Sequence, residues 1–162
     1  MDKRKLAQAL KFLLYGSGNT LSCAESCTGG NIAHKITSIS GSSEYFAGGV
    51  VSYAAEVKET LLGVKDLTIR KQGIVSSSVA EEMACGVRKL LGTTFSVATT
   101  GWADSYGDEH EPAGTVWIAV DGPKGTRSIK FHSNSTRNVN ISRFTSVAIR
   151  FLIDYISEYI SI

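Results

Sequence analysis

The chain has 162 residues, of which 43% are apolar and 20% are charged. This length is enough for one domain with a sizeable core and too short for two, so we expect a single domain over residues 1–162. The composition excludes a disordered chain and a coiled coil. The formal net charge of +2, with no long basic run, gives no reason to expect nucleic acid as a partner.

The N-terminal segment, residues 1–19, is charged and then amphipathic. It lacks the unbroken apolar core and the small-residue cleavage site of a signal peptide. No apolar run approaches the length of a membrane span. We therefore expect a cytoplasmic protein without membrane contact.

The three cysteines, Cys23, Cys27 and Cys85, form an odd number. Without a secretory signal, such a set argues against a disulfide framework. No second cysteine pair has zinc-ribbon spacing and the histidines lie far apart in the sequence, so we expect no metal site.

Apolar residues at helical spacing predict five helices. In chain order, these are expected at residues 3–15, from 32 to about 38, and at residues 55–62, 76–91 and 139–160. Gly63 is the expected stop of the third helix. Ser76, Ser77 or Ser78 can cap the fourth, which has acidic residues early and basic residues late.

Runs of apolar, β-branched and aromatic residues predict five strands. They are expected at residues 20–24, 43–54, 94–101, 114–122 and 126–133, the second with a bulge at Gly48–Gly49. Strands and helices alternate in the first part of the chain, whereas the last strands follow one another through short links. This order predicts an α/β fold with a mixed sheet rather than a purely parallel one.

The stretch AESCTGG, residues 24–30, joins a predicted strand to a predicted helix. Amide groups at a helix N-terminus are unpaired and suit a phosphate or a developing oxyanion. The two glycines let the backbone come close to such a group. Ser26 or Cys27 could act there as a nucleophile, but hydroxyl residues before a helix, such as Thr28, commonly serve only as caps.

A nucleophilic hydroxyl needs a base, and none of the histidines has an obvious claim to that role. A lysine can serve if burial or a neighbouring charge lowers its pKa from about 10.4 toward neutrality. Lys58 follows the strand that ends near Tyr53 and would lie about one turn into the next helix, where both could face the same sheet edge as Ser26. It could equally be a solvated lysine near Glu56 and Glu59.

Five segments together resemble the CinA C-terminal domain family. They are residues 24–30, 40–64, 73–84, 97–103 and 112–120, in order over nearly the whole chain, and AESCTGG is the most specific of them. The resemblance implies a three-layer α/β/α sandwich with a mixed sheet. It also implies an enzyme that hydrolyses the carboxamide of nicotinamide mononucleotide to nicotinate mononucleotide and ammonia, without a metal or a cofactor.

By position, the resemblance implies that Ser26 is the nucleophile and Lys58 its base, with Tyr53 beside them. The partner would be a small nucleotide substrate, and we expect a homo-oligomer. The expected contacts to the substrate are Thr28, Gly29, Gly30, Thr100, Gly101 and Arg137. The backbone amides of residues 28–30 are candidates for the oxyanion hole because of their place at a helix start. Arg137 is the nearest match to a family arginine that precedes the last helix, and Arg143 is the alternative for the phosphate.

The chain departs from the family after Ala103. The family usually continues with glycine and proline, whereas residues 104–108 here are acidic and bulky, and residues 108–111 add negative charge. Ala55 also replaces a usual asparagine. We expect the loop of residues 104–111 at the mouth of the cleft, where it would repel a phosphate unless it turns outward. Three functions stay open: hydrolysis of nicotinamide mononucleotide, hydrolysis of another amide by the same residues, and nucleotide binding without catalysis.

Overall fold

The computed structural model describes residues 2–161. The strands are β1 (Leu21–Glu25), β2 (Phe46–Val51), β3 (Phe95–Gly101), β4 (Thr115–Asp121) and β5 (Arg127–His132). The helices are α1 (Lys3–Leu14), α2 (Asn31–Thr37), α3 (Ala55–Leu62), α4 (Asp66–Gln72), α5 (Ser77–Leu91) and α6 (Arg137–Ile160), with a short 3-10 helix, η1, at Ser42–Glu44.

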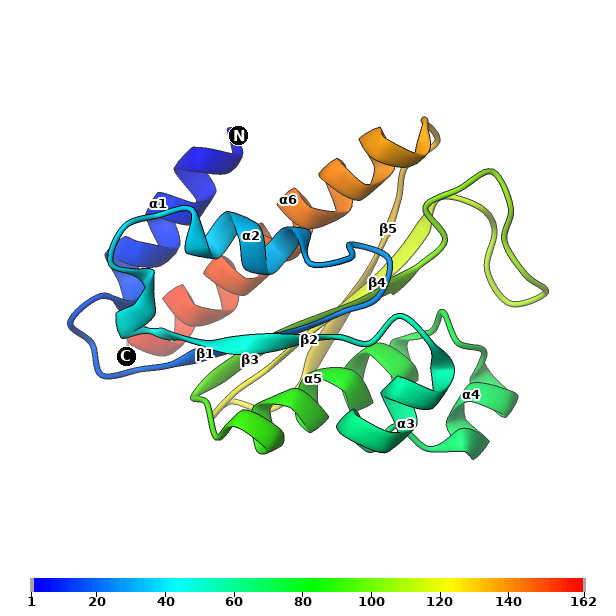
Figure 1. The fold of residues 1–162 in the computed structure, drawn as a ribbon, viewed down its shortest axis with the longest axis horizontal. Coiled ribbons are helices and arrows are strands. Elements are labelled where there is room, and N and C mark those ends of the chain that lie inside the picture. Colours follow the sequence, from blue (N-terminus) through cyan, green and yellow to red (C-terminus); the bar gives the residue numbers. More distant parts are fainter. Residues whose placement is uncertain (1, 162) are drawn as a thin grey trace.

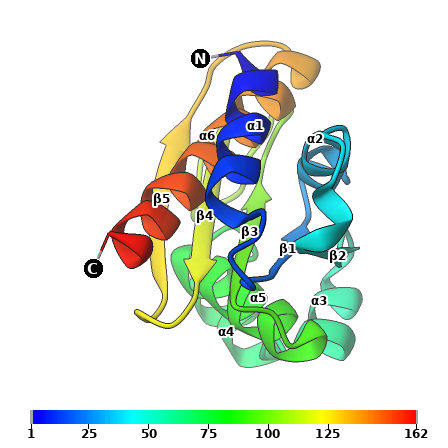
Figure 2. The same ribbon diagram turned by 90° about the vertical axis from the view of Figure 1, so that its left-hand side faces the viewer.

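The strands form one sheet in the order β2-β1-β3-β4-β5, which Figure 2 shows from right to left. The first three of these run parallel, and β4 pairs antiparallel with both β3 and β5. A short link, residues 122–126, joins β4 to β5, and the longer loop of residues 102–114 joins β3 to β4 without a helix, while the parallel half needs helical crossovers. The predicted mixed sheet is therefore confirmed.

Helices cover both faces of the sheet and make three layers (Figure 1). One face carries α1, α2 and α6, and the other carries α3, α4 and α5. Each face has its own apolar core, with Phe95, Phe144 and Leu152 in the first and Val79, Met83 and Leu62 in the second. This is the single-domain α/β/α sandwich that the family resemblance implies. Within residues 2–161, no helix combines the length and the apolar character needed to cross a bilayer.

Most of the predicted boundaries agree with the structure to within a few residues. Gly63 ends α3 with a φ of 70°, and the Ser76 hydroxyl accepts a hydrogen bond from the amide of Val79 at the start of α5. The irregularity in β2 lies at Ala47, the extra residue opposite the step from Leu21 to Ser22 and next to the predicted bulge. Helix α4 and η1 were not predicted from the sequence; α4 has no buried residue, so it leaves no apolar pattern.

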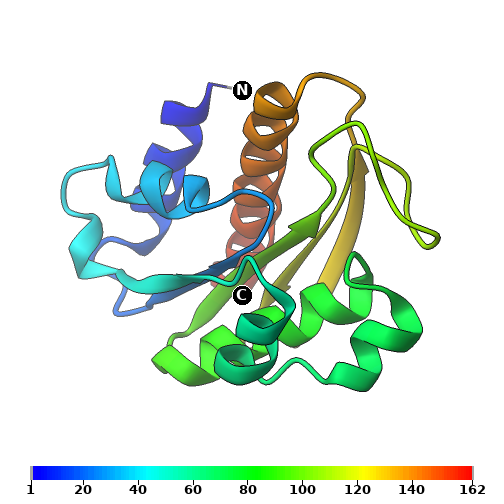
Figure 3. The same cartoon turned by 45° about the vertical axis from the view of Figure 1, so that its right-hand side comes forward.

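The segments that follow β1, β2 and β3 all begin at the same end of the sheet. The carboxyl ends of the parallel strands β1, β2 and β3 meet there, which is where open α/β sheets bind their ligands. Figure 3 shows the loop between β3 and β4 and the start of α6 at the same end. The side-chain amide of Asn140, on α6, ties this loop down through a 2.9 Å hydrogen bond to the carbonyl of Ala103.

Candidate active site

A cavity of about 140 Å³ lies at this end of the sheet. It is lined by Ser26, Cys27, Tyr53, Lys58, Ile74, Val75, Thr100, Gly101, Trp102, Ala103, Asp104, Tyr106 and Arg137. The structure thus brings Ser26, Tyr53 and Lys58 into one site although they are distant in sequence.

Ser26 directly follows β1 and is held by the neighbouring strand. Its amide donates a hydrogen bond to the carbonyl of Thr99 on β3 over 3.1 Å, which extends the parallel pairing by one residue. Its hydroxyl oxygen Oγ lies 2.9 Å from the Nζ of Lys58. The backbone therefore fixes the position of Ser26, and its hydroxyl is in contact with the Lys58 amine.

Lys58 is buried, with only 1% of its surface exposed. Its Nζ also donates to the carbonyls of Ser52 over 2.7 Å and of Tyr53 over 3.3 Å. A neutral amine keeps two hydrogens and one lone pair. With both hydrogens directed to these carbonyls, the lone pair of a neutral Lys58 faces Ser26 Oγ.

Burial also changes the charge of Lys58. Loss of solvation lowers the pKa of Lys58 from its usual value near 10.5 to about 8, and the nearby Cys27 thiol opposes this only in part. A substantial fraction of the side chain is therefore neutral in mildly alkaline solution. None of the described residues that line the cavity is a histidine, and Lys58 supplies the amine next to the serine.

Cys27 lies beside Ser26, but its thiol is poorly suited to act as a nucleophile. Burial raises the pKa of the Cys27 thiol to about 12, despite the opposing effect of Lys58. The thiolate, which is the reactive form of cysteine, is therefore scarce at neutral pH.

Glu25 is a structural residue of the site that sequence reasoning missed. Its buried carboxylate accepts hydrogen bonds from the amides of Ile32 (2.8 Å) and Ala33 (3.1 Å) and from the hydroxyl of Thr28 (2.6 Å). These amides belong to the first turn of α2, so Glu25 caps the helix from within the fold. The cap fixes the turn that follows Ser26.

The substrate contacts expected of residues 28–30 remain a prediction, and the structure gives the position of these residues. Thr28, Gly29 and Gly30 do not line the cavity. The amide of Gly29 donates to the carbonyl of Ser26, and the glycines have φ values of 59° and 99°, which the tight turn requires. The start of α2 is occupied by Glu25, and the residues before it shape the turn.

Thr100 and Gly101 both line the cavity, at the end of β3. The Thr100 hydroxyl donates to the carbonyl of Ile74 over 2.8 Å and so holds the segment before α5 against the site. A Cβ at Gly101 would lie 2.7 Å from the carbonyl oxygen of Thr115, so only glycine fits this close strand contact. Their positions are as expected, and both shape the wall of the cavity.

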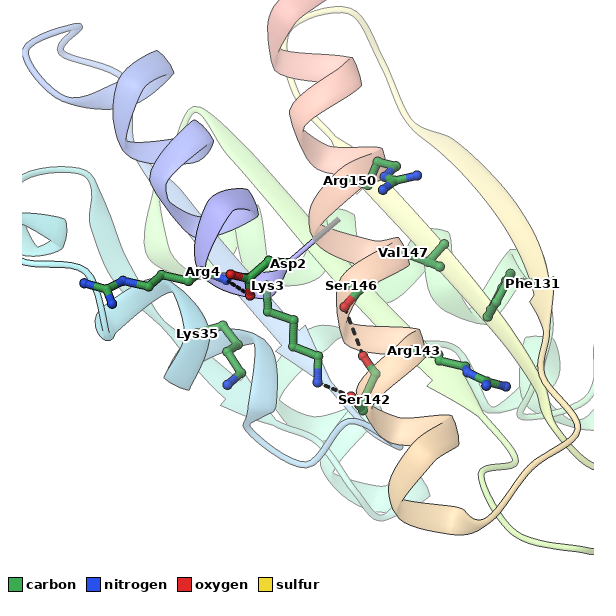
Figure 4. A pocket seen from close by; sticks show the side chains of 10 residues that line it. All are labelled: Asp2, Lys3, Arg4, Lys35, Phe131, Ser142, Arg143, Ser146, Val147 and Arg150. Carbon is green, nitrogen blue, oxygen red and sulfur yellow. Dashed lines mark hydrogen bonds between the residues drawn. The ribbon is translucent and has the colours of Figure 1, made fainter.

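Arg137, the first residue of α6, lies at the rim of the cavity. One terminal nitrogen donates to the Tyr53 hydroxyl over 2.9 Å, and the other pairs with the Asp104 carboxylate over 3.1 Å. The Tyr53 hydroxyl and the Asp104 carboxylate together raise the pKa of Arg137. Arg143, the alternative arginine, donates to Ser133 and lines a different cleft (Figure 4).

The acidic loop after β3 divides into two parts. Asp104 and Tyr106 line the cavity, as expected for a loop at its mouth. Glu111, by contrast, does not line the cavity; its largely buried carboxylate pairs with Lys130 and accepts a hydrogen bond from the Trp117 indole. Among residues 2–161, no three His, Cys, Asp or Glu side chains come together as a metal site would require.

Fold and site together define an α/β sandwich protein with a buried serine–lysine pair at the carboxyl end of its parallel strands. The chain belongs to the CinA C-terminal domain family, whose family model matches residues 3–156.

Named relatives support this membership. The chain is 48% identical over 134 residues to a CinA-like protein from Flavobacterium psychrophilum, covering 82% of this chain and 32% of the relative, and 50% identical over 124 residues to one from Nostoc sp., covering 76% and 29%. The chain thus spans about a third of the length of these curated relatives.

Solved structures show the same fold. The competence damage-inducible protein A of Klebsiella pneumoniae superimposes with a TM-score of 0.93 at 27% identity, covering 97% of this chain and 98% of that one. The competence/damage inducible protein CihA of Agrobacterium tumefaciens gives a TM-score of 0.90 at 32% identity, covering 95% of both chains.

Proposed function

We propose that the protein is an amidohydrolase in which Ser26 is the nucleophile and Lys58 the general base. The proposed reaction is hydrolysis of the carboxamide of a pyridine nucleoside or nucleotide. The substrate that the family resemblance implies is nicotinamide mononucleotide, with nicotinate mononucleotide and ammonia as the products. The observation that carries the proposal is the 2.9 Å contact between Lys58 Nζ and Ser26 Oγ, made by a buried lysine.

In the first half-reaction, neutral Lys58 takes the hydroxyl proton of Ser26 while Oγ bonds to the carboxamide carbon. The carbonyl oxygen becomes an oxyanion. The amide of Cys27 is the best-placed donor for it, because it immediately follows the nucleophile and donates to no other residue among 2–161. The carbon–nitrogen bond then breaks as protonated Lys58 returns its proton to the nitrogen, and ammonia leaves.

In the second half-reaction, Lys58 takes a proton from water, and the resulting hydroxide attacks the ester carbon on Ser26. The tetrahedral intermediate collapses, Oγ recovers its proton from Lys58, and the product leaves as the carboxylic acid, which then gives its proton to the solvent. Proton and electron balance close within the serine, the lysine and one water molecule.

The cavity dimensions favour a substrate whose reacting end is small. A volume of about 140 Å³ is below the several hundred ångströms cubed of a typical ligand pocket, but it suits a flat carboxamide-bearing ring. The remainder of a nucleotide would then extend past Tyr53 toward the rim.

Release of ammonia from nicotinamide mononucleotide by the purified protein tests the proposal, with Ser26→Ala as the blank. Turnover in the parent that is lost in Ser26→Ala supports the hydrolase. Saturable binding of the nucleotide without ammonia release would instead favour a non-catalytic nucleotide-binding protein.

A further inference from the structure

Lys58 and Arg137 are the two cationic side chains that line the cavity. Lys58 is in contact with Ser26 and lies buried at the base of the site. Arg137 is therefore the cation that a substrate phosphate at the rim would meet. Its guanidinium, however, already has an anionic partner of its own.

Asp104 is this anionic partner, and neighbouring groups hold its carboxylate in place. One carboxylate oxygen pairs with Arg137 over 3.1 Å, and the other accepts a hydrogen bond from the amide of Ser105 over 3.1 Å. The preceding residue, Ala103, is tied to α6 through Asn140. The second terminal nitrogen of Arg137 is engaged by Tyr53, so a phosphate must displace Asp104 or share the guanidinium with it.

Sharing is unfavourable because a phosphate ester and a carboxylate on the same side of one guanidinium repel each other. The exposed acids Asp108 and Glu109 of the same loop do not line the cavity, so the conflict lies with Asp104. A substrate without a phosphate meets no such conflict, and the Arg137–Asp104 pair can stay intact beside it.

We infer that Asp104 is a specificity-determining residue that selects against a phosphate group, so that the site prefers an aromatic carboxamide carried on an unphosphorylated nucleoside. This inference rests on the proposed amidohydrolase function and names the substrate class of that site. Asp104 acts by occupying Arg137 and takes no part in the chemical step.

Two substrates that differ only in the phosphate test it: nicotinamide riboside and nicotinamide mononucleotide. We expect the parent to have the higher kcat/KM for the riboside. Asp104→Asn keeps the shape of the side chain and an oxygen for the Ser105 amide but removes the charge. It should raise kcat/KM for the mononucleotide about tenfold, through KM, and raise that for the riboside by much less, so that the ratio of the two values shifts toward the mononucleotide.

Two further variants make the result specific to this ion pair. Glu109→Gln removes a charge from the same loop. Glu109 lies 3.4 Å from His110 and does not line the cavity, so this variant should leave the ratio of the two kcat/KM values nearly unchanged. Arg137→Met combined with Asp104→Asn should cancel the gain for the mononucleotide, since the freed guanidinium is then absent.

The inference is wrong if the parent prefers the mononucleotide, or if Asp104→Asn and Glu109→Gln change the ratio equally. The proposed hydrolase is a separate matter, because it fails only if neither substrate releases ammonia. In that event, calorimetric titration of both compounds into Ser26→Ala and into Ser26→Ala with Asp104→Asn decides the inference. The inference is supported if Asp104→Asn tightens the binding of the mononucleotide and leaves the binding of the riboside as it was. It is overturned if the two variants bind the mononucleotide equally, or if neither compound binds.

Discussion

The Nζ of Lys58 lies 2.9 Å from the Oγ of Ser26, and the lysine side chain is almost wholly shielded from water. The two residues come from different elements, the turn after β1 and the helix α3, and meet because β1 and β2 are parallel neighbours. Burial explains why this lysine can be neutral. The contact explains how its lone pair can accept the hydroxyl proton of Ser26.

The rate of ammonia release should depend on pH through Lys58. Burial lowers the pKa of Lys58 to about 8, and only the neutral amine can take the serine proton. Below that pH, kcat/KM should rise about tenfold per pH unit, and it should level off above it. A profile measured from pH 6 to pH 9.5 that stays flat would rule out a lysine with this pKa as the base.

The same pKa shift predicts a change in stability with pH. Lys58 has a lower pKa in the folded chain than in the unfolded chain, so between about pH 8 and 10.5 the unfolded state binds more protons. The unfavourable contribution of charged, buried Lys58 is complete below pH 8 and disappears as the pH rises through this window. Relative to Lys58→Met, the free energy of unfolding of the parent should therefore rise by up to about 3 kcal/mol. Urea titrations of both proteins at pH 7.5 and pH 10 measure it, and parallel changes in the two would contradict it.

Cys27 should be dispensable for turnover. Its thiol is buried and its pKa is raised to about 12, so it supplies little thiolate. Cys27→Ser should keep kcat within about tenfold of the parent, in contrast to Ser26→Ala. Retention of activity after treatment with iodoacetamide gives an independent check. Loss of ammonia release in Cys27→Ser, with its fold intact by circular dichroism, would transfer the nucleophile role to the thiol.

Glu25 should matter for stability more than any exposed carboxylate. Glu25→Gln places an amide NH₂ group against the amides of Ile32 and Ala33 and leaves one of them without an acceptor. We expect a loss of about 2–4 kcal/mol in the free energy of unfolding. Glu44→Gln is the matched control, because Glu44 also accepts from a backbone amide, that of Gly16, but at the surface. Equal losses in the two variants would show that the buried cap has no special role.

The sequence predicts the fold well because its signals are local. The apolar stripes of α1 and α5, the stop at Gly63 and the cap at Ser76 each depend on residues within a few positions of one another. The mixed sheet was expected because the last strands follow one another without a helix between them. Helix α4 was missed because it is short and buries none of its residues.

The site was predictable only in part. Ser26, Tyr53 and Lys58 were identified through the family resemblance, and the structure brings them to one cavity. The role of Glu25 could not be deduced, because its partners are amides seven and eight residues ahead that come near only when α2 turns back over β1.

Long-range ion pairs leave no sequence pattern at all. Asp104 and Arg137 are 33 residues apart and belong to different elements, so their pairing depends on how the loop after β3 meets the start of α6. The acidic residues of the loop predict its place at the cleft mouth but not the residue with which Asp104 pairs.

The most direct test of the serine–lysine mechanism is ammonia release by Lys58→Arg and Lys58→Met, with folding checked by circular dichroism. Arginine keeps the positive charge but stays protonated at all working pH values, and methionine keeps much of the apolar stem without a base. The mechanism predicts that both variants fold and that both lose about two to four orders of magnitude in kcat. Near-parental turnover in Lys58→Arg would show that the residue is not the base and would contradict the mechanism.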